Sequence, residues 1–383
     1  MSVTTPAGFR ASGVAAGIRS GEGPDVAFVL NDGPLQTAAG VFTRNRFAAA
    51  PVLWSQQVLA GGEVQAVVLN AGGANACTGP EGFQDTHATA EHAAQLLGCG
   101  AGEVAVCSTG LIGVRLPIGL LLGGVTSAVK SLSTFGGDAA ARAVMTTDTV
   151  PKQAVFGGLG WSVGGFAKGA GMLAPELATM LVVLTTDAVA DASALDVALR
   201  SATATTFDRL DSDGCMSTND TVLLLASGAS GVTPTADELA TAVQSVCADL
   251  ALQLLADAEG ASKEIRIDVV RAASEADAVT GARAVSRSNL FKCAVHGNDP
   301  NWGRVLSALG TTDIAFEPDR VDVAINGVKV ARGGAAGDDR SLVDLKGREV
   351  VVTIDLAAGS GAASVWTNDL TAAYVHENSA YSS

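Results

Sequence analysis

The segment from residue 168 to residue 181 is the most unusual in the chain and reads Lys168-Gly-Ala-Gly-Met-Leu-Ala-Pro-Glu-Leu-Ala-Thr-Met-Leu181. A lysine beside two glycines indicates a charge held where the carboxylate of a ligand can approach, because glycine lets other groups come close to the backbone. The segment is not a P-loop, in which the lysine follows the glycines. Taken alone, its last residues also fit the beginning of a buried strand, since most threonines have no chemical role.

Two further segments are unusually rich in small and polar residues. The first is Asn70-Ala-Gly-Gly-Ala-Asn-Ala-Cys-Thr-Gly79, which directly follows a predicted strand. So much glycine and asparagine indicates unusual backbone angles or close approach to another group, although a tight surface loop explains it equally well. The second is Cys107-Ser-Thr-Gly-Leu-Ile-Gly113, between a predicted strand and a predicted helix. We expect it either to present N–H groups to an anion at a helix N-terminus or simply to cap that helix.

A fourth segment, Phe291-Lys-Cys-Ala-Val-His-Gly-Asn-Asp-Pro-Asn-Trp-Gly-Arg304, combines a histidine with a turn signal. Asp299-Pro300 followed by Trp302 predicts a turn that leads into a helix. His296 has the chemistry of a base, but a lone histidine in such a place is more often a structural hydrogen-bonding group.

Composition limits the class of protein. Of the 383 residues, 48% are hydrophobic and 16% are charged, which is enough apolar surface for a sizeable core. The formal net charge is −15, so an acidic surface makes nucleic acid an unfavourable partner. The N-terminus shows neither the basic nor the apolar region of a signal peptide, and the apolar stretch 116–129 is too short to span a bilayer. We therefore expect a cytoplasmic protein with no membrane partner.

Cysteine and histidine usage argues against a metal site. Six cysteines are scattered along the chain, none as a CxxC pair, and there are only four histidines. The sequence also contains no GxSxG, no HExxH and no dinucleotide-binding GxGxxG. We expect no metal and no cofactor, and we expect the cysteines to be mostly buried small hydrophobic residues.

Strand-like and helix-like periodicities alternate along most of the chain, but the last third has short strands close together, which favours an α+β fold. Three stretches, 134–138, 211–219 and 332–340, resemble linkers, and the last is rich in Gly, Ala and Asp. Approximate spatial domains are expected at 1–240 and 241–383. Predicted strands are 26–30, 65–69, 104–108, 180–184, 222–226, 265–270, 321–325, 328–330, 350–354 and 363–366, and predicted helices are 86–97, 116–132, 192–207, 236–256 and 275–287.

Taken together, these segments resemble the ornithine acetyltransferase (glutamate N-acetyltransferase) family of arginine biosynthesis. The resemblance covers nearly the whole chain, and the segment 168–181 with its Ala-Thr-Met-Leu is its most specific part. The other matching segments are 8–18, 40–46, 70–79, 108–110, 145–149 with 151–152, 217–221, 259–263, 299–304 and 377–381.

The resemblance implies a self-cleaving, Ntn-like enzyme with its own topology. Cleavage between Ala178 and Thr179 would give an alpha chain, 1–178, and a beta chain, 179–383, which assemble as a heterotetramer of two of each. Thr179 would be the nucleophile, with its freed amine as the base. A smaller C-terminal α+β domain would return its tail to the active site.

The remaining site residues implied by the resemblance form two sets. Thr109 and Gly110 match the oxyanion-hole pair. The substrate-contacting positions match Lys168, Glu259, Asn378, Ser383 and one threonine of Thr146-Thr147, of which we favour Thr147, besides Thr179 itself.

The implied reaction moves an acetyl group from N2-acetylornithine to glutamate. The family also includes bifunctional members that use acetyl-CoA, and a related self-processing aminopeptidase or amidase would share the Thr179 chemistry. A binding protein that kept the fold without activity is the alternative from another class. The sequence departs from the family at Asp213-Gly-Cys-Met216, where Asp-Gly-Asp-Thr is more usual, and has serine at Ser262 and Ser383 in place of threonine.

Overall fold

The computed structural model describes residues 2–21, 23–172 and 180–380, and it divides into two compact units. Of these described residues, the first unit consists of those up to Asp208 and of Cys215–Asp257, and the second of Arg209–Gly214 and 258–380. The border expected near residue 240 falls inside helix α6 (Ala236–Ala256), whereas the contacts place the division after that helix.

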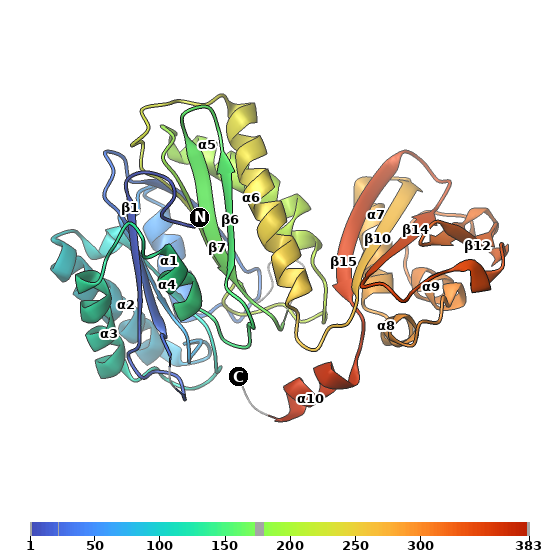
Figure 1. Ribbon diagram of the computed structural model, residues 1–383, viewed down its shortest axis with the longest axis horizontal. Coiled ribbons are helices and arrows are strands. Elements are labelled where there is room, and N and C mark those ends of the chain that lie inside the picture. The colour runs from blue at the N-terminus through green and yellow to red at the C-terminus, as the bar shows by residue number, and fades with distance from the viewer. Residues whose placement is uncertain (1, 22, 173–179, 381–383) are drawn as a thin grey trace. The chain divides into compact units, whose positions relative to one another are not determined.

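The first unit is built on two sheets, seen in Figure 1. The order in one is β1-β2-β4-β5, and in the other β3-β9-β8-β7-β6. The strands of the first sheet are β1 (Phe9–Val14), β2 (Val26–Asn31), β4 (Ala66–Asn70) and β5 (Val104–Ser108). Those of the second are β3 (Thr37–Phe42), β9 (Thr221–Ala226), β8 (Leu181–Thr186), β7 (Ser162–Lys168) and β6 (Lys152–Gly157).

Four layers make up this unit, because helices cover the outer face of each sheet while the inner faces share one hydrophobic core. Helices α2 and α3 pack on the first sheet and α5 and α6 on the second, whereas α1 contacts β5 and β3 and α4 contacts β1, β2 and β7, so that these two helices touch both sheets. Every residue of β2, β4, β5, β8 and β9 is buried, as expected for strands covered on both faces. The other helices are α1 (Ala50–Leu59), α2 (Gly79–Leu97), α3 (Ile118–Lys130), α4 (Gly137–Ala143) and α5 (Ala192–Thr205).

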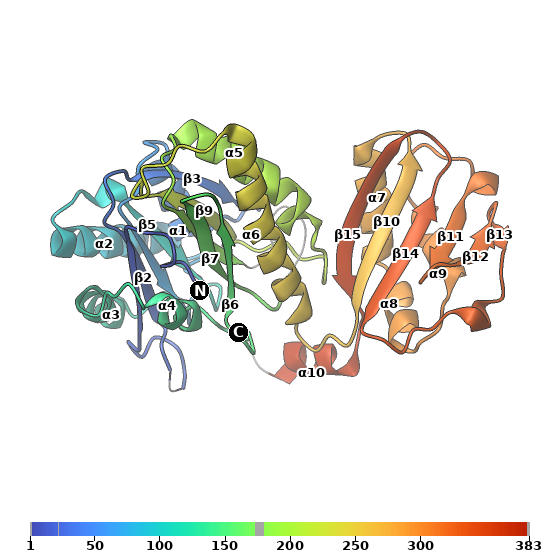
Figure 2. The same ribbon diagram turned by 45° about the horizontal axis from the view of Figure 1, so that its top comes forward.

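The second unit has one sheet with the strand order β13-β12-β11-β14-β10-β15, which Figure 2 shows nearly face on. Along β14 buried residues alternate with more exposed ones, so one face carries the core. The strands are β10 (Glu264–Ala272), β11 (Asp322–Ile325), β12 (Val328–Arg332), β13 (Ala335–Ala336), β14 (Glu349–Asp355) and β15 (Gly361–Asn368). The helices are α7 (Glu275–Ser286), α8 (Asn289–His296), α9 (Trp302–Leu309) and α10 (Ala372–Ala380).

The predicted α+β class is confirmed, because antiparallel pairs dominate all three sheets while β4–β5, β8–β9 and β10–β14 are parallel. The helix predicted at 116–132 is α3, which begins at Ile118 after Pro117, so the segment 107–113 ends in a loop and not at the helix N-terminus. Helix α6 is long and apolar enough to cross a membrane, but it packs on β6, β7 and α5 as a core helix.

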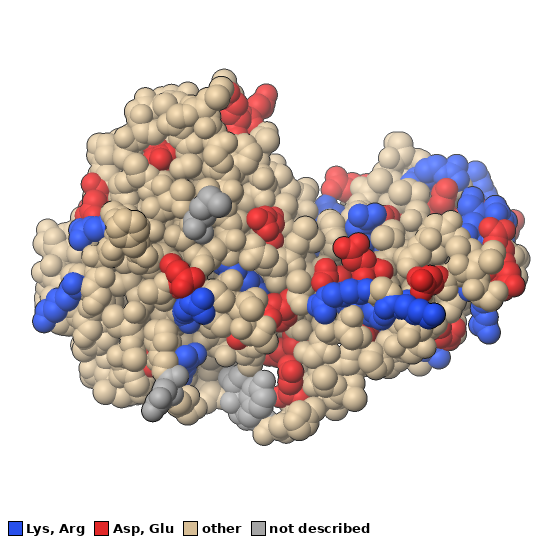
Figure 3. All heavy atoms as spheres, in the orientation of Figure 1, with Lys and Arg blue, Asp and Glu red and all other residues tan. Residues whose placement is uncertain are grey.

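Charged side chains are sparse over the first unit on the face seen in Figure 3, and those over the second unit mix both signs. No continuous basic area covers that face of the described chain.

Candidate active site

Thr109 and Gly110 lie at the end of β5, against the glycine-rich loop 70–79. The Thr109 N–H donates to the Asn70 carbonyl oxygen at 3.0 Å. Gly110 has a φ of +128°, and a Cβ added to it would stand 2.6 Å from the Gly73 nitrogen. Only glycine fits such a contact. The two segments that sequence reasoning singled out separately therefore form one structure, made of loop rather than of a helix N-terminus.

Lys168, the last residue of β7, is 1% exposed. Its Nζ atom donates to Thr109 Oγ1 at 3.2 Å and to Thr146 Oγ1 at 2.8 Å. A buried ammonium group is costly unless it is hydrogen-bonded, and these hydroxyl groups offset part of that cost. Of the threonine pair, it is Thr146 whose hydroxyl contacts Lys168; the preference for Thr147 as the substrate contact stays a prediction.

A buried ion-pair network lies next to Lys168. The Lys152 ammonium contacts Asp148 Oδ1 at 2.6 Å and Asp257 Oδ2 at 2.5 Å, and Asp148 also accepts the Gly169 N–H at 2.7 Å. Burial acts to raise the pKa of Asp148, but Lys168 and Lys152 outweigh it and the pKa is lowered. Asp148 is thus a buried anion beside both lysines.

Asn219 ties three segments of the candidate site together. Its side-chain amide donates to the Ala74 carbonyl oxygen at 2.6 Å and to the Ser108 carbonyl oxygen at 2.8 Å. It belongs to the matching segment 217–221, which precedes β9. One buried side chain therefore fixes the glycine-rich loop and the strand end that carries Thr109.

Asp220 is a functional candidate that sequence reasoning missed. It is fully buried, and its Oδ1 atom accepts the Met180 N–H at 3.1 Å. Burial raises its pKa well above the usual range, while the Met180 amide, the Ser217 hydroxyl and Lys168 oppose that shift. The signal available in the sequence was an acidic residue directly before an apolar strand.

Glu259 and Asn378 come together in the second unit. The Asn378 side-chain amide donates to Glu259 Oε2 at 2.9 Å. The loop that carries Glu259 is held by the segment after β15, because Thr371 Oγ1 donates to the Gly260 carbonyl oxygen at 2.7 Å. Thus the two predicted substrate contacts of this unit share one location. Ala178, Thr179 and Ser383 lie outside the described residues.

His296 is held by a buried carboxylate. Its Nδ1 atom lies 2.9 Å from Asp369 Oδ2, and Asp369 also accepts the N–H groups of Ser262 and Lys263. This supports the interpretation of His296 as a structural hydrogen-bonding group. Among the described residues no group of three His, Cys, Asp or Glu side chains could hold a metal.

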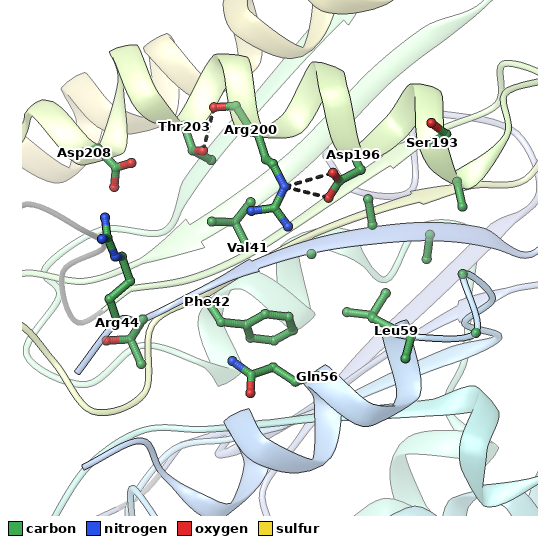
Figure 4. A pocket seen from close by; sticks show the side chains of 18 residues that line it. Val41, Phe42, Arg44, Gln56, Leu59, Ser193, Asp196, Arg200, Thr203 and Asp208 are labelled. Carbon is green, nitrogen blue, oxygen red and sulfur yellow. Dashed lines mark hydrogen bonds and ion pairs between the residues drawn. The ribbon is translucent and has the colours of Figure 1, made fainter. Parts of the chain in front are cut away.

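A cavity of about 850 Å³ opens beside β3, away from Lys168 and Thr109. Figure 4 shows Asp196 and Arg200 of α5 on one side of the strand and Gln56 and Leu59 of α1 on the other. Arg200 is already paired with Asp196. Because none of the predicted site residues lines it, we do not assign the reaction to this cavity.

The chain was compared with protein families, curated relatives and solved structures. The model of the ArgJ family matches residues 10–383. The arginine biosynthesis bifunctional protein ArgJ of Streptomyces coelicolor is 67% identical over 383 residues, all of both chains, and that of Thermobifida fusca is 63% identical over 382 residues, again all of both. A solved chain of ornithine acetyltransferase from Mycobacterium tuberculosis, complexed with ornithine, is 58% identical; it covers 47% of this chain and 96% of its own, with a TM-score of 0.44.

Proposed function

The chain belongs to the ArgJ family, and on that premise we propose that it transfers an acetyl group from N2-acetylornithine to glutamate through Thr179. The products are ornithine and N-acetylglutamate. The structural observation that carries the proposal is the position of Lys168, which contacts Thr109 and pairs in register with Leu181, two residues after Thr179. This pairing supports a site in which the nucleophile Thr179, the oxyanion pair that includes Thr109 and the buried cation Lys168 act together.

The first step in the proposal is self-cleavage. Thr179 Oγ attacks the carbonyl carbon of Ala178, the peptide C–N bond breaks, and the Thr179 nitrogen takes up the hydroxyl proton. Water then hydrolyses the resulting ester. The hydroxyl of Thr179 is regenerated, and its α-amino group is free.

That new amine is the base of the second step. An α-amino group has a pKa of about 7.7–8.0, against about 10.4 for lysine, so far more of it is unprotonated near neutral pH. Base and nucleophile belong to one residue, which keeps the entropic cost of orienting them low. An uncut chain has no such base, so cleavage creates the catalyst.

Acetyl transfer then proceeds in two halves. The Thr179 oxygen attacks the acetyl carbonyl of N2-acetylornithine, ornithine leaves with the proton, and an acetyl ester remains on Thr179. The amino group of glutamate attacks that ester and regenerates the hydroxyl. This order predicts ping-pong kinetics. Thr109 and Gly110 would stabilise both tetrahedral oxyanions, a contribution of about 2.7–4 kcal/mol for a well-placed donor.

The predicted substrate contacts fit amino-acid substrates. Lys168 is a cation suited to a carboxylate or to the developing oxyanion, and Glu259 is an anion suited to the ornithine ammonium. Asn378, hydrogen-bonded to Glu259, would orient that carboxylate. Thr147 and Ser383 complete the proposed set of contacts.

The test measures ornithine release from N2-acetylornithine with and without glutamate. The proposal predicts release that depends on glutamate and forms N-acetylglutamate in equal amount. Equal release in buffer alone would instead identify a hydrolase of the self-processing aminopeptidase or amidase kind. Binding of N2-acetylornithine without any turnover would identify a binding protein that kept the fold.

A second activity is favoured by the names of the relatives, which call the Streptomyces coelicolor and Thermobifida fusca proteins bifunctional. We propose that this chain also acetylates glutamate with acetyl-CoA, so that it catalyses both this reaction and the transfer from N2-acetylornithine. An assay with acetyl-CoA, glutamate and no N2-acetylornithine tests this; no N-acetylglutamate above the blank would limit the chain to recycling. We further propose a cytoplasmic heterotetramer of two alpha and two beta chains.

A further inference from the structure

Asp220 is a buried carboxyl group to which the proposed reaction gives no role. It lies directly before β9 and is fully buried. Its Oδ1 atom accepts the Met180 N–H, whereas its Oδ2 atom has no hydrogen-bond partner in the part of the chain that the structure describes. A carboxyl group so placed costs stability, which calls for an explanation.

The backbone holds Asp220 and Met180 side by side. Strands β8 and β9 are parallel, with Leu181 opposite Thr221, so Met180 and Asp220 each stand one residue before paired strands. The Thr221 N–H donates to the Met180 carbonyl oxygen at 3.1 Å, and the Thr43 N–H donates to the Asp220 carbonyl oxygen at 2.9 Å. Met180 is itself fully buried. Both of its backbone polar groups are therefore fixed, one of them only by the Asp220 side chain.

Among the described residues, two charges of opposite sign act on Asp220. Lys168 of β7 attracts it and Asp208, in the short turn before Arg209, repels it. Lys168 already donates to Thr109 and Thr146. Desolvation dominates, and it raises the pKa of Asp220 well above its usual value.

From this geometry we propose that Asp220 is a positioning residue, whose buried carboxyl oxygen fixes Met180 and thereby orients the preceding residue, Thr179, for self-cleavage and acetyl transfer. The inference rests on the proposed function. It needs only the acceptor at Oδ1, because no proton moves to or from Asp220. Thr179 and Met180 share a planar peptide link, so a shift of Met180 displaces the nucleophile by a similar amount.

Two substitutions separate the acceptor from the charge. Asp220→Asn keeps the carbonyl oxygen and cannot ionise, whereas Asp220→Ala removes the acceptor. Asp187→Ala is the matched control, because Asp187 is also buried, stands just after the other end of β8, and accepts the N–H groups of Ala7 and Ser162. If Asp220→Ala acted only by destabilising the fold, Asp187→Ala should slow cleavage and turnover to a similar extent.

The first measurement follows cleavage of the freshly translated full-length chain by gel electrophoresis and mass spectrometry. The second measures the rate of acetyl transfer as a function of pH. We expect Asp220→Asn and Asp187→Ala to cut and turn over close to the parent, with unchanged pH profiles. Asp220→Ala should cut and turn over about 10²-fold more slowly, the cost of a misplacement near 1 Å.

Loss of cleavage in Asp220→Asn, or a displaced acid limb of its pH profile, would overturn the proposal, because either result would show that an acceptor oxygen at this position is not sufficient. Normal rates in Asp220→Ala would also overturn it. If Asp220→Ala does not fold, Asp220→Asn alone decides. A parent chain that is never cut between Ala178 and Thr179 would instead refute the proposed function, which keeps the two failures distinct.

Discussion

The Nζ atom of Lys168 lies 3.2 Å from Thr109 Oγ1, in a part of the first unit where both residues are almost fully buried. The two are 59 residues apart in the chain, and they meet because β5 and β7 end near each other. A fixed ammonium beside the proposed oxyanion pair is aimed at negative charge that develops during acyl transfer, where a low dielectric strengthens its effect.

Replacing Lys168 by methionine should therefore impair transfer much more than folding. We expect Lys168→Met to lower kcat/KM for N2-acetylornithine by about 10²–10³-fold, as for the loss of one oxyanion donor. Lys130→Met, at the exposed end of α3, should leave the rate unchanged. Steady-state rates with both substrates check this, and a Lys168→Met rate within the scatter of the control would remove the lysine from the mechanism.

Gly110→Ala should damage the site through its backbone. The added Cβ would meet the Gly73 nitrogen at 2.6 Å, at a φ of +128° that alanine rarely adopts. We expect a lower unfolding midpoint and strongly reduced acetyl transfer. Gly119→Ala is the matched control: it lies in α3 with open space around its Cβ and should gain up to about 1 kcal/mol of helix stability. Thermal unfolding and activity of both variants test this, and a fully active Gly110→Ala would contradict it.

Asn219→Ala should loosen the loop and the strand end together. It leaves the carbonyl oxygens of Ala74 and Ser108 without their donor, at a cost of about 1–3 kcal/mol for each buried group left unsatisfied. Asn219→Asp keeps the shape but cannot donate, so it should be no better than alanine and adds a buried charge. Urea unfolding of the two variants gives the answer; parental stability of Asn219→Asp would show that these hydrogen bonds contribute nothing.

The protonation of Asp220 predicts a particular pH dependence of stability. The pKa of Asp220 is raised in the folded state. Below the unfolded pKa of about 3.9 the group is protonated in both states and costs no stability. As the pH rises from there toward the folded pKa, the free energy of unfolding decreases. Across that window the parent should lose about 1.4 kcal/mol per pH unit relative to Asp220→Asn. Urea unfolding at several pH values measures the difference, which should vanish near pH 4. If the stability difference between parent and Asp220→Asn did not change with pH, the pKa of Asp220 would be the same in the folded and unfolded chains, and the group would be ionised in the folded chain.

Much of the fold follows from local patterns, and the exceptions have physical causes. The predicted bounds of α6 and β5 match the structure. Strand β7 was not predicted, because Gly164 and Gly165 weaken its strand signal. A Cβ at Gly164 would stand 2.4 Å from the Ser2 carbonyl oxygen. Glycine is therefore required here by a tertiary contact, which a local sequence pattern does not contain.

The site shows the same division between local and long-range information. The family resemblance implied Thr109, Lys168, Glu259 and Asn378 as site residues, but not which of them lie together. The contact of Lys168 with Thr146, and the role of Asn219 in joining two loops, depend on strands brought together from distant parts of the chain. Asp220 was overlooked because its importance comes from complete burial beside Met180, which the sequence does not express.

The central claim is tested most directly by the intact mass of the purified protein, measured beside Thr179→Ala. The account predicts two chains for the parent, residues 1–178 and 179–383, and one uncut, inactive chain for the variant. A single unbroken parent chain with full acetyl-transfer activity, or a Thr179→Ala variant that turns over normally, would contradict it.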